Sequence, residues 1–119
     1  MLRSLLFAPG DNGEILEKAL NSDADGVILD LEDAVAPSAK DDARQTVRGF
    51  LDRHVDATAT VSVRMNALGS GGFVDAELVA HPAVDMVLVP MVETPREAWH
   101  TAEVIRRFED REDVSPALL

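Results

Sequence analysis

The chain has 119 residues, 46% of them hydrophobic, which is enough for one ordinary globular core. Its 22 acidic and 11 basic residues give a net charge of -11, and such a surface repels nucleic-acid phosphates and anionic lipids. No stretch approaches the roughly 20 consecutive apolar residues of a membrane span. The absence of cysteine excludes disulfides, thiolate metal sites and a cysteine nucleophile. We therefore expect a cytoplasmic protein with no nucleic-acid or membrane partner.

The first half of the chain predicts two strands, each followed by a helix. Residues 2–8 form a short apolar run, and the turn at Pro9-Gly10 closes it too early for a signal peptide. Asp11 or Asn12 then caps a helix. A second strand, residues 27–31, precedes a longer helix that starts at Pro37-Ser38. The apolar positions of the two helices recur at helical spacing and are Ile15, Leu16, Ala19 and Leu20, then Ala39, Ala43, Val47, Phe50 and Leu51.

The second half continues this alternation of strands and helices. Its expected elements are a strand at 60–65, a flexible loop at 66–72, a short helix at 73–80, a strand at 85–89 and a helix from Thr94-Pro95 to Phe108. The last helix buries a stripe of Ala98, Ala102, Ile105 and Phe108, and Trp99 at its border is expected to pack against the core. Residues 109–116 read as a loose tail, and residues 116–119 resemble the start of a fifth strand.

Four consecutive strand–helix units with apolar strands predict an α/β fold with a parallel sheet covered by helices. Two architectures fit this pattern. One is an open doubly wound sheet. The other is part of a (β/α)8 barrel, which needs about 250 residues, so four units in 119 residues are close to half a barrel.

Charged side chains gather where the second and third strands end, and ligands bind at the carboxyl ends of strands in both architectures. Asp30, Glu32 and Asp33 follow the second strand, while Arg64 and Asn66 follow the third. Strand alternation puts Arg64 and Asn66 on one face. If these faces converge, the arginine can hold a substrate carboxylate and the acids can hold a hydrated Mg²⁺. A structural ion pair at a strand end explains the same residues, and the pattern leaves both interpretations open.

Other polar groups are weaker candidates. The histidines lie away from the strand ends, and we expect surface or capping roles for His54, His81 and His100. The glycines Gly69, Gly71 and Gly72 follow no phosphate-loop pattern and lack its Lys-Ser/Thr, which favours a mobile loop.

Four blocks of sequence resemble a known family. In chain order they are RSLLFAPGDN (3–12), GVILDLEDAVAPSAKDDAR (26–44), VSVRMNALGS (61–70) and DMVLVPMVET (85–94). Together they resemble the HpcH/HpaI aldolase/citrate lyase family, most closely its branch similar to the citrate lyase β-subunit. The resemblance covers essentially the whole chain.

The resemblance implies a Mg²⁺-dependent (β/α)8 barrel of the phosphoenolpyruvate/pyruvate-binding type. Its reaction would cleave a 3-hydroxyacyl thioester, citryl- or malyl-like, into an acetyl or acyl thioester of CoA or an acyl-carrier protein and a 2-keto acid such as oxaloacetate. A divalent ion and a guanidinium would stabilise the enolate charge of that step. Residues 1–119 would be the N-terminal half of the barrel, cut near the start of the fifth strand, and inactive alone.

The resemblance also implies roles for single residues. The set comprises Arg64 as the substrate-binding arginine, Glu32 and Asp33 as acids that hold metal-bound water, Asp30 and Asn66 as supporting groups, and Arg3, Lys40 and Arg44 as contacts of the thioester carrier.

Two departures from the family pattern bear on these roles. The fourth strand usually ends in Leu-Pro-Lys, whereas this chain has Val89-Pro90-Met91. The family's direct metal ligands, a Glu after the fifth strand and an Asp after the sixth, are expected beyond residue 119. Glu93 follows the fourth strand and is not assigned as that ligand, although a weak metal site from Glu32, Asp33 and Glu93 stays open.

Two other classes of protein compete with the enzyme interpretation. A phospho-acceptor receiver domain has similar length, but it needs an Asp after the third strand, where this chain has Arg64. A non-catalytic carboxylate-binding or assembly subunit would keep Arg64 without turnover. An open half-barrel exposes strand edges, which favours a homo-oligomer or association with the other barrel half.

Overall fold

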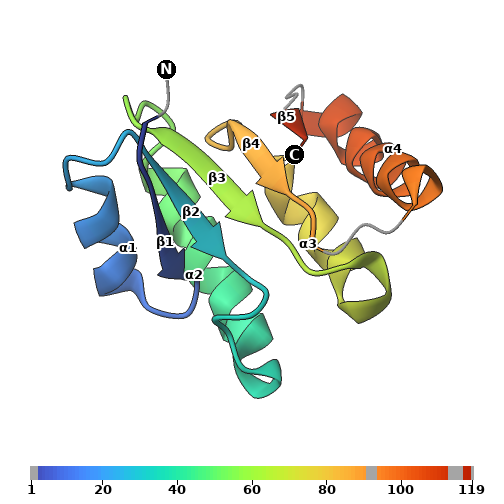
Figure 1. The fold of residues 1–119 in the computed structure, drawn as a ribbon, viewed down its shortest axis with the longest axis horizontal. Helices are drawn as coiled ribbons and strands as arrows, with labels where there is room; N and C mark the ends of the chain where they lie inside the picture. Colours follow the sequence, from blue (N-terminus) through green and yellow to red (C-terminus); the bar gives the residue numbers. More distant parts are fainter. Residues whose placement is uncertain (1–2, 91–93, 113–116, 119) are drawn as a thin grey trace.

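The computed structural model describes residues 3–90, 94–112 and 117–118 and shows strands and helices in strict alternation (Figure 1). The elements are β1 (Leu5–Pro9), α1 (Gly13–Leu20), β2 (Gly26–Asp30), the 3₁₀ turn η1 (Pro37–Ala39), α2 (Lys40–Arg53), β3 (Thr60–Arg64), the 3₁₀ turn η2 (Leu68–Ser70), α3 (Gly72–Val79), β4 (Met86–Leu88), α4 (Pro95–Glu112) and β5 (Ala117–Leu118). The predicted α/β class is confirmed, and a short fifth strand pairs with β4 where the sequence predicted one.

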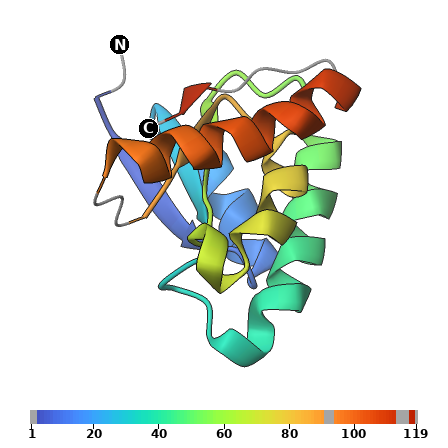
Figure 2. The ribbon, with the colours of Figure 1, turned by 90° about the vertical axis from the view of Figure 1, so that its right-hand side faces the viewer.

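The strands form one parallel sheet in the order β1-β2-β3-β4-β5. A doubly wound sheet reverses its strand order at a switch point, and the described strands show no such reversal. Because parallel crossovers are right-handed, a steady progression of strands puts the connecting helices on one side of the sheet. Figure 2 shows α2 and α3 together on one side of the strands. Of the two architectures left open by the sequence, the structure has the order of the barrel.

The strand register sorts the side chains into two faces. Phe7 lies opposite Ile28, Ile28 lies opposite Ser62, and Asp30 lies opposite Arg64. These five residues alternate with the residues that face the helices, so they share the other side of the sheet. We call this side the Arg64 face. It carries the polar strand ends, whereas the helix side carries the core.

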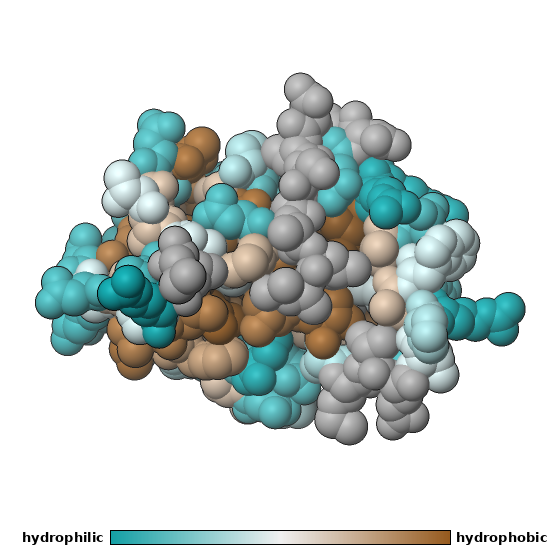
Figure 3. Space-filling model, turned by 45° about the horizontal axis from the view of Figure 1, so that its top comes forward, coloured by the Kyte–Doolittle hydropathy of each residue, from teal (hydrophilic) through white to brown (hydrophobic). Residues whose placement is uncertain are grey.

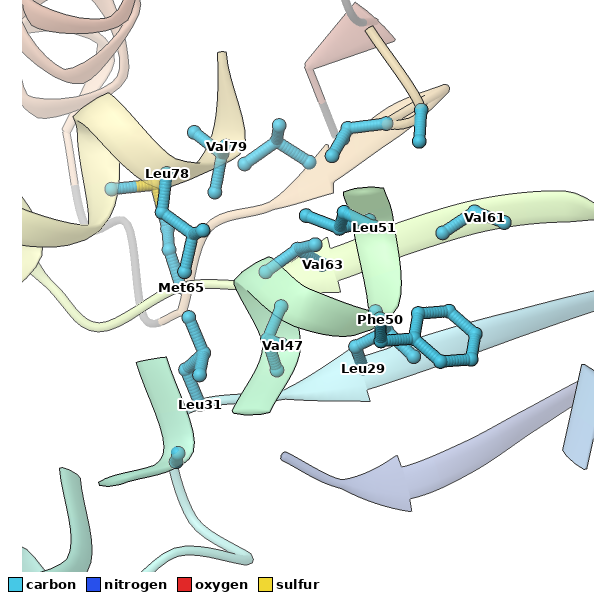
Figure 4. Close-up of a cluster of buried hydrophobic side chains, with 14 of the residues drawn as sticks. Leu29, Leu31, Val47, Phe50, Leu51, Val61, Val63, Met65, Leu78 and Val79 are labelled. Carbon is cyan, nitrogen blue, oxygen red and sulfur yellow. The ribbon is translucent and has the colours of Figure 1, made fainter. Parts of the chain in front are cut away.

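The core fills the space between the sheet and the helices α2 and α3 (Figure 4). Fully buried members are Leu29, Leu31, Val47, Phe50, Leu51, Val61, Val63, Met65 and Val79. Each such side chain contributes about 1.5–3 kcal/mol on burial, so this cluster is the main force that fixes the sheet against the helices. The predicted α2 stripe is confirmed at four of its five positions, while Ala39 in η1 is partly buried.

Some expectations about single elements are wrong. Ile15 is exposed because α1 turns Leu16 and Ala19 toward the sheet. Trp99 is 63% exposed and does not pack into the core. Among the α4 residues whose side chains are described, Thr101, Val104 and Ile105 are buried. That helix continues to Glu112, so part of the expected loose tail is helical.

The remaining polar expectations are met in the helices and turns. Asn12, one of two predicted caps, accepts a hydrogen bond from the Ile15 backbone N–H at 3.2 Å. His54 pairs with Glu17 and thereby joins the end of α2 to α1. His81 accepts from the Ala83 N–H. Within the described residues, no helix is both long enough and apolar enough to cross a membrane.

Candidate functional site

The last residues of β2 and β3 form the centre of the site. Arg64 Nε donates to Asp30 Oδ1 at 2.9 Å, and Arg64 Nη2 donates to Oδ2, which makes a bidentate ion pair. The same carboxylate accepts the backbone N–H groups of Glu32 at 2.8 Å and Ala34 at 3.0 Å. Asp30 is 1% exposed, and these four donors satisfy the buried charge.

Electrostatics keep this pair ionised. Burial acts to raise the pKa of Asp30, but the Arg64 hydrogen bonds and the two backbone N–H groups outweigh it, so the pKa lies below its ordinary value. The hydrogen bonds and charge of Asp30 raise the pKa of Arg64 despite the burial of the guanidinium. The expected ion pair at the strand end is therefore present, and it holds one edge of the guanidinium in a fixed orientation.

Glu32 and Asp33 add two further carboxylates beside Arg64. Glu32 Oε1 lies 3.6 Å from Arg64 Nε. Burial, followed by the hydrogen bond and charge of the neighbouring Asp33, raises the pKa of Glu32. The two acids therefore repel each other, and a bound cation would relieve that repulsion.

Oxygen ligands of this kind suit Mg²⁺, which keeps several waters and takes one or two carboxylates. Among the described residues no group of three or more acidic, histidine or cysteine side chains is placed to hold a metal ion. Glu93, the third member of the alternative metal site, lies outside the described residues. The described residues thus do not supply a complete ligand shell, and contacts of Glu32 and Asp33 with metal-bound water stay a prediction.

Lys40, at the start of α2, points at the strand ends. Its Nζ donates to the backbone oxygens of Leu31 at 2.8 Å and Glu32 at 2.7 Å, and to Asn66 Oδ1 at 2.9 Å. These three bonds use all three donors of the ammonium group. Lys40 therefore fixes the backbone that carries Glu32.

A buried network continues from Asn66 into α3. Asp75 is 0% exposed and accepts from Asn66 N at 2.8 Å, Asn66 Nδ2 at 2.7 Å and Arg44 Nε at 2.7 Å. Arg44 also pairs with Asp41. The network joins the loops after β2 and β3 to the helices α2 and α3.

The structure brings together some of the predicted site residues and separates others. Asp30, Glu32 and Arg64 meet as expected. Asn66 was expected on the face of Arg64; its side chain instead bonds to Lys40, Asp75 and the backbone oxygen of Leu31, because β3 ends at Arg64 and the alternation ends with it.

The expected contacts of a thioester carrier have other surroundings. Arg3 lies before β1, at the amino end of the sheet, where its backbone N–H donates to Asp25 at 2.7 Å. Lys40 and Arg44 belong to the network of Asn66 and Asp75. Sequence reasoning missed Asp75; an acid between apolar residues of α3 was the available signal, and Glu77 two residues later gives the same signal.

Comparison with known proteins identifies the family. Residues 3–116 match the sequence model of the HpcH/HpaI aldolase/citrate lyase family. The chain belongs to this family. The assignment confirms the resemblance predicted from the four sequence blocks and removes the receiver domain as an alternative.

Two curated relatives show the range of activities among similar proteins. The citrate lyase subunit beta of Escherichia coli is 36% identical over 121 residues, which covers 98% of this chain and 40% of that subunit. A (3S)-malyl-CoA thioesterase of Cereibacter sphaeroides is 35% identical over 104 residues, covering 87% of this chain and 36% of that enzyme. The chain thus spans well under half the length of these relatives.

Solved structures of similar proteins contain ligands. CitE of Mycobacterium tuberculosis in complex with magnesium, acetoacetate and coenzyme A has a TM-score of 0.67 at 35% identity, over 82% of this chain and 35% of that one. The citrate lyase β subunit of the same organism with oxaloacetate and magnesium has a TM-score of 0.65 at 34% identity, over 82% of this chain and 42% of that one.

A more distant structure supports the fold alone. The malate synthase of Haloferax volcanii has a TM-score of 0.85 at 15% identity, over 99% of this chain and 40% of that one. Nearly the whole length of this chain, with its sequential parallel sheet, therefore has the same fold as part of a larger enzyme.

Proposed function

We propose that this chain is the arginine-bearing part of a Mg²⁺-dependent carbon–carbon lyase of the citrate lyase β-subunit type. The reaction is cleavage of a citryl- or malyl-like 3-hydroxyacyl thioester into an acyl thioester and a 2-keto acid. Residues 1–119 then form the first units of a (β/α)8 barrel, and the direct metal ligands come from outside these residues. The chain alone is expected to be inactive.

The ion pair of Arg64 with Asp30 is the observation that carries this proposal. It uses Nε and Nη2, and no acceptor from the described residues is within hydrogen-bonding distance of Nη1. A guanidinium held by one edge at the carboxyl end of a strand is ready to bind a carboxylate with the other edge. Family membership and the oxaloacetate-bound relative support a 2-keto acid as that ligand.

The residues of this chain have distinct tasks in the proposed reaction. Arg64 binds the carboxylate of the 2-keto acid and disperses the negative charge that develops as the carbon–carbon bond breaks. Glu32 and Asp33 orient water around the metal, and Asp30 fixes Arg64. When bound, Mg²⁺ would supply Lewis-acid stabilisation of the enolate oxygen.

Coenzyme A or an acyl-carrier protein is the proposed carrier of the acyl group. The CitE complex with coenzyme A and the malyl-CoA thioesterase relative support this choice. Contacts of Arg3, Lys40 and Arg44 with the carrier stay predictions, and Lys40 would have to give up a protein acceptor to make one.

Calorimetric titration of oxaloacetate, with and without Mg²⁺, tests the carboxylate site. We expect Arg64→Ala to abolish binding and Arg64→Lys, which keeps the charge but loses the planar fork, to weaken it at least tenfold, about 1.4 kcal/mol. Arg106→Ala is the control, because Arg106 is exposed on α4 and pairs with Glu103. Equal affinity in wild type and Arg64→Lys would refute the proposed role of Arg64. Binding without turnover after the remaining barrel segments of a relative are added would favour the non-catalytic carboxylate-binding subunit.

A further inference from the structure

Arg64 has a second contact, and its partner is apolar. The guanidinium carbon Cζ lies over the ring of Phe7, 4.8 Å from the ring centroid. Phe7 comes from β1, whereas Arg64 comes from β3. The arginine side chain therefore reaches across β2 on the Arg64 face to meet an aromatic ring two strands away.

Core packing does not explain this phenylalanine. Phe7 is 54% exposed and does not belong to the buried cluster on the helix side. Its register partner Ile28 is almost completely buried, so the ring stands on the Arg64 face beside the strand ends. A large apolar side chain that stays half in solvent loses part of its burial energy, and the cation–π contact with Arg64 offsets some of that loss.

Phe7 and Asp30 restrain the guanidinium in complementary ways. Asp30 binds the edge formed by Nε and Nη2, which fixes the direction of the side chain. The ring of Phe7 covers one face of the guanidinium, which limits rotation about that edge. Within the described residues no acceptor bonds to Nη1, so this nitrogen can meet a ligand in an orientation that is set before the ligand arrives.

We propose that Phe7 is a positioning residue that preorganises Arg64 for binding a planar carboxylate. This inference rests on the proposed function, because it takes Arg64 as the carboxylate ligand. An arginine that is already ordered gives up less side-chain entropy on binding, so the ring contributes to affinity without touching the ligand. Loss of a partly exposed cation–π contact should weaken carboxylate binding about two- to fivefold.

The experiment uses the intact chain with Phe7→Leu, Phe7→Tyr and a matched control, Phe73→Leu. Phe73 is also 54% exposed, but it lies on α3 beside His100. The Arg64 Nε–H resonance, assigned by its loss in Arg64→Lys, reports the ring directly. In Phe7→Leu we expect it to move downfield, because ring-current shielding is lost, and to exchange faster with water. Calorimetry with oxaloacetate and Mg²⁺ should show the two- to fivefold loss of affinity.

Phe7→Tyr should retain both the resonance position and the affinity, because the aromatic face is kept, and Phe73→Leu should change neither. A Phe7→Leu protein with unchanged resonance, or with a shifted resonance but wild-type affinity, would overturn the inference while leaving Arg64 as the ligand. If Arg64→Lys binds as well as wild type, the proposed function fails instead. If wild type binds no oxaloacetate, the proposed function also fails. The exchange of the Arg64 Nε–H with water then still tests the inference, because an unchanged rate in Phe7→Leu would show that Phe7 does not order Arg64.

Discussion

The contacts of Asp30 explain why a buried strand can end on an acid. Its carboxylate is 1% exposed, yet Arg64 and two backbone N–H groups supply four hydrogen bonds. The arrangement converts a costly buried charge into a fixed support for the arginine. An asparagine at this position has the same shape but no negative charge, so the substitution measures the contribution of the charge without changing the packing.

We predict that Asp30→Asn lowers the free energy of unfolding by about 2–3 kcal/mol at pH 7, because charged hydrogen bonds are lost. The lowered pKa of Asp30 means that its contribution is fully present above the unfolded-state pKa, about 3.9, and disappears as the pH falls through the folded-state value. Urea titrations should therefore give the same difference in the free energy of unfolding between wild type and variant at pH 6 and pH 7, which both lie about two units or more above that pKa. The two free energies should converge in acid. Asp56→Asn, at an exposed position, is the control, and a constant difference at all pH values would contradict the prediction.

Lys40 has a comparable role on the other side of the strand ends. Lys40→Met removes the donor shared by Leu31, Glu32 and Asn66, and we predict a loss of about 2–3 kcal/mol in the free energy of unfolding. Lys18→Met, at an exposed position of α1, should cost far less. Urea denaturation compares the two variants. Equal losses would mean that the bonds of Lys40 add nothing to stability.

The sequence predicted the positions of the site residues that lie within strands, but not of those that lie beyond the strand ends. Asp30 and Arg64 are the last residues of paired strands, so alternation and parallel register suffice to bring them together. Asn66 lies two residues beyond β3, where no periodicity fixes the direction of a side chain. Lys40 and Asp75 act across elements, and helical spacing alone does not indicate which strand end a helical residue meets.

At the scale of elements, the helix α3 depends on the backbone that precedes it. Gly71 has a φ of 101°, and a Cβ there would lie 2.7 Å from Arg44 Nη2. The expected flexible loop is thus a turn whose glycine makes room for the arginine that pairs with Asp75. The sequence showed the glycines but not which of them needs the left-handed conformation.

We predict that Gly71→Ala lowers the free energy of unfolding by about 1–3 kcal/mol, because it combines an unfavourable φ with displacement of Arg44. Gly69→Ala is a matched control in the same segment: a Cβ at Gly69 meets nothing within 4 Å. Thermal or urea unfolding of the two variants measures the difference. Equal stability of Gly71→Ala and Gly69→Ala would show that this backbone position is not constrained as the structure has it.

For the whole molecule, the units could be predicted but their order in space could not. Apolar strands and helical stripes predict four strand–helix units in either architecture, since both use the same local patterns. The order of the strands depends on which edges meet, and the structure shows that each described strand pairs with its neighbours in sequence. The core residues Val47 and Phe50 were predictable because burial follows the helical period. Trp99 was not, since a residue at the border of a stripe can face either way.

The sheet begins at an apolar edge. β1 pairs with β2 and with no other described strand, and its residues Leu5, Leu6 and Phe7 are all exposed. Figure 3 shows apolar residues reaching the surface over a broad area on one side of the molecule. An unpaired strand edge with apolar side chains favours association, whereas the net charge of -11 opposes it.

We predict concentration-dependent self-association of the chain through the β1 edge, stronger at high salt because salt screens the repulsion. Leu6→Lys places a charge on that edge and should shift the equilibrium toward monomer. Ile15→Lys is matched to it, since Ile15 on α1 is 40% exposed and Leu6 is 43% exposed. Sedimentation velocity over a range of concentrations, at low and high salt, measures the effect. A monomer under every condition, or equal association of the two variants, would show that the β1 edge is not an interface. The net charge of the chain would then be sufficient to prevent the apolar edges of two copies from associating.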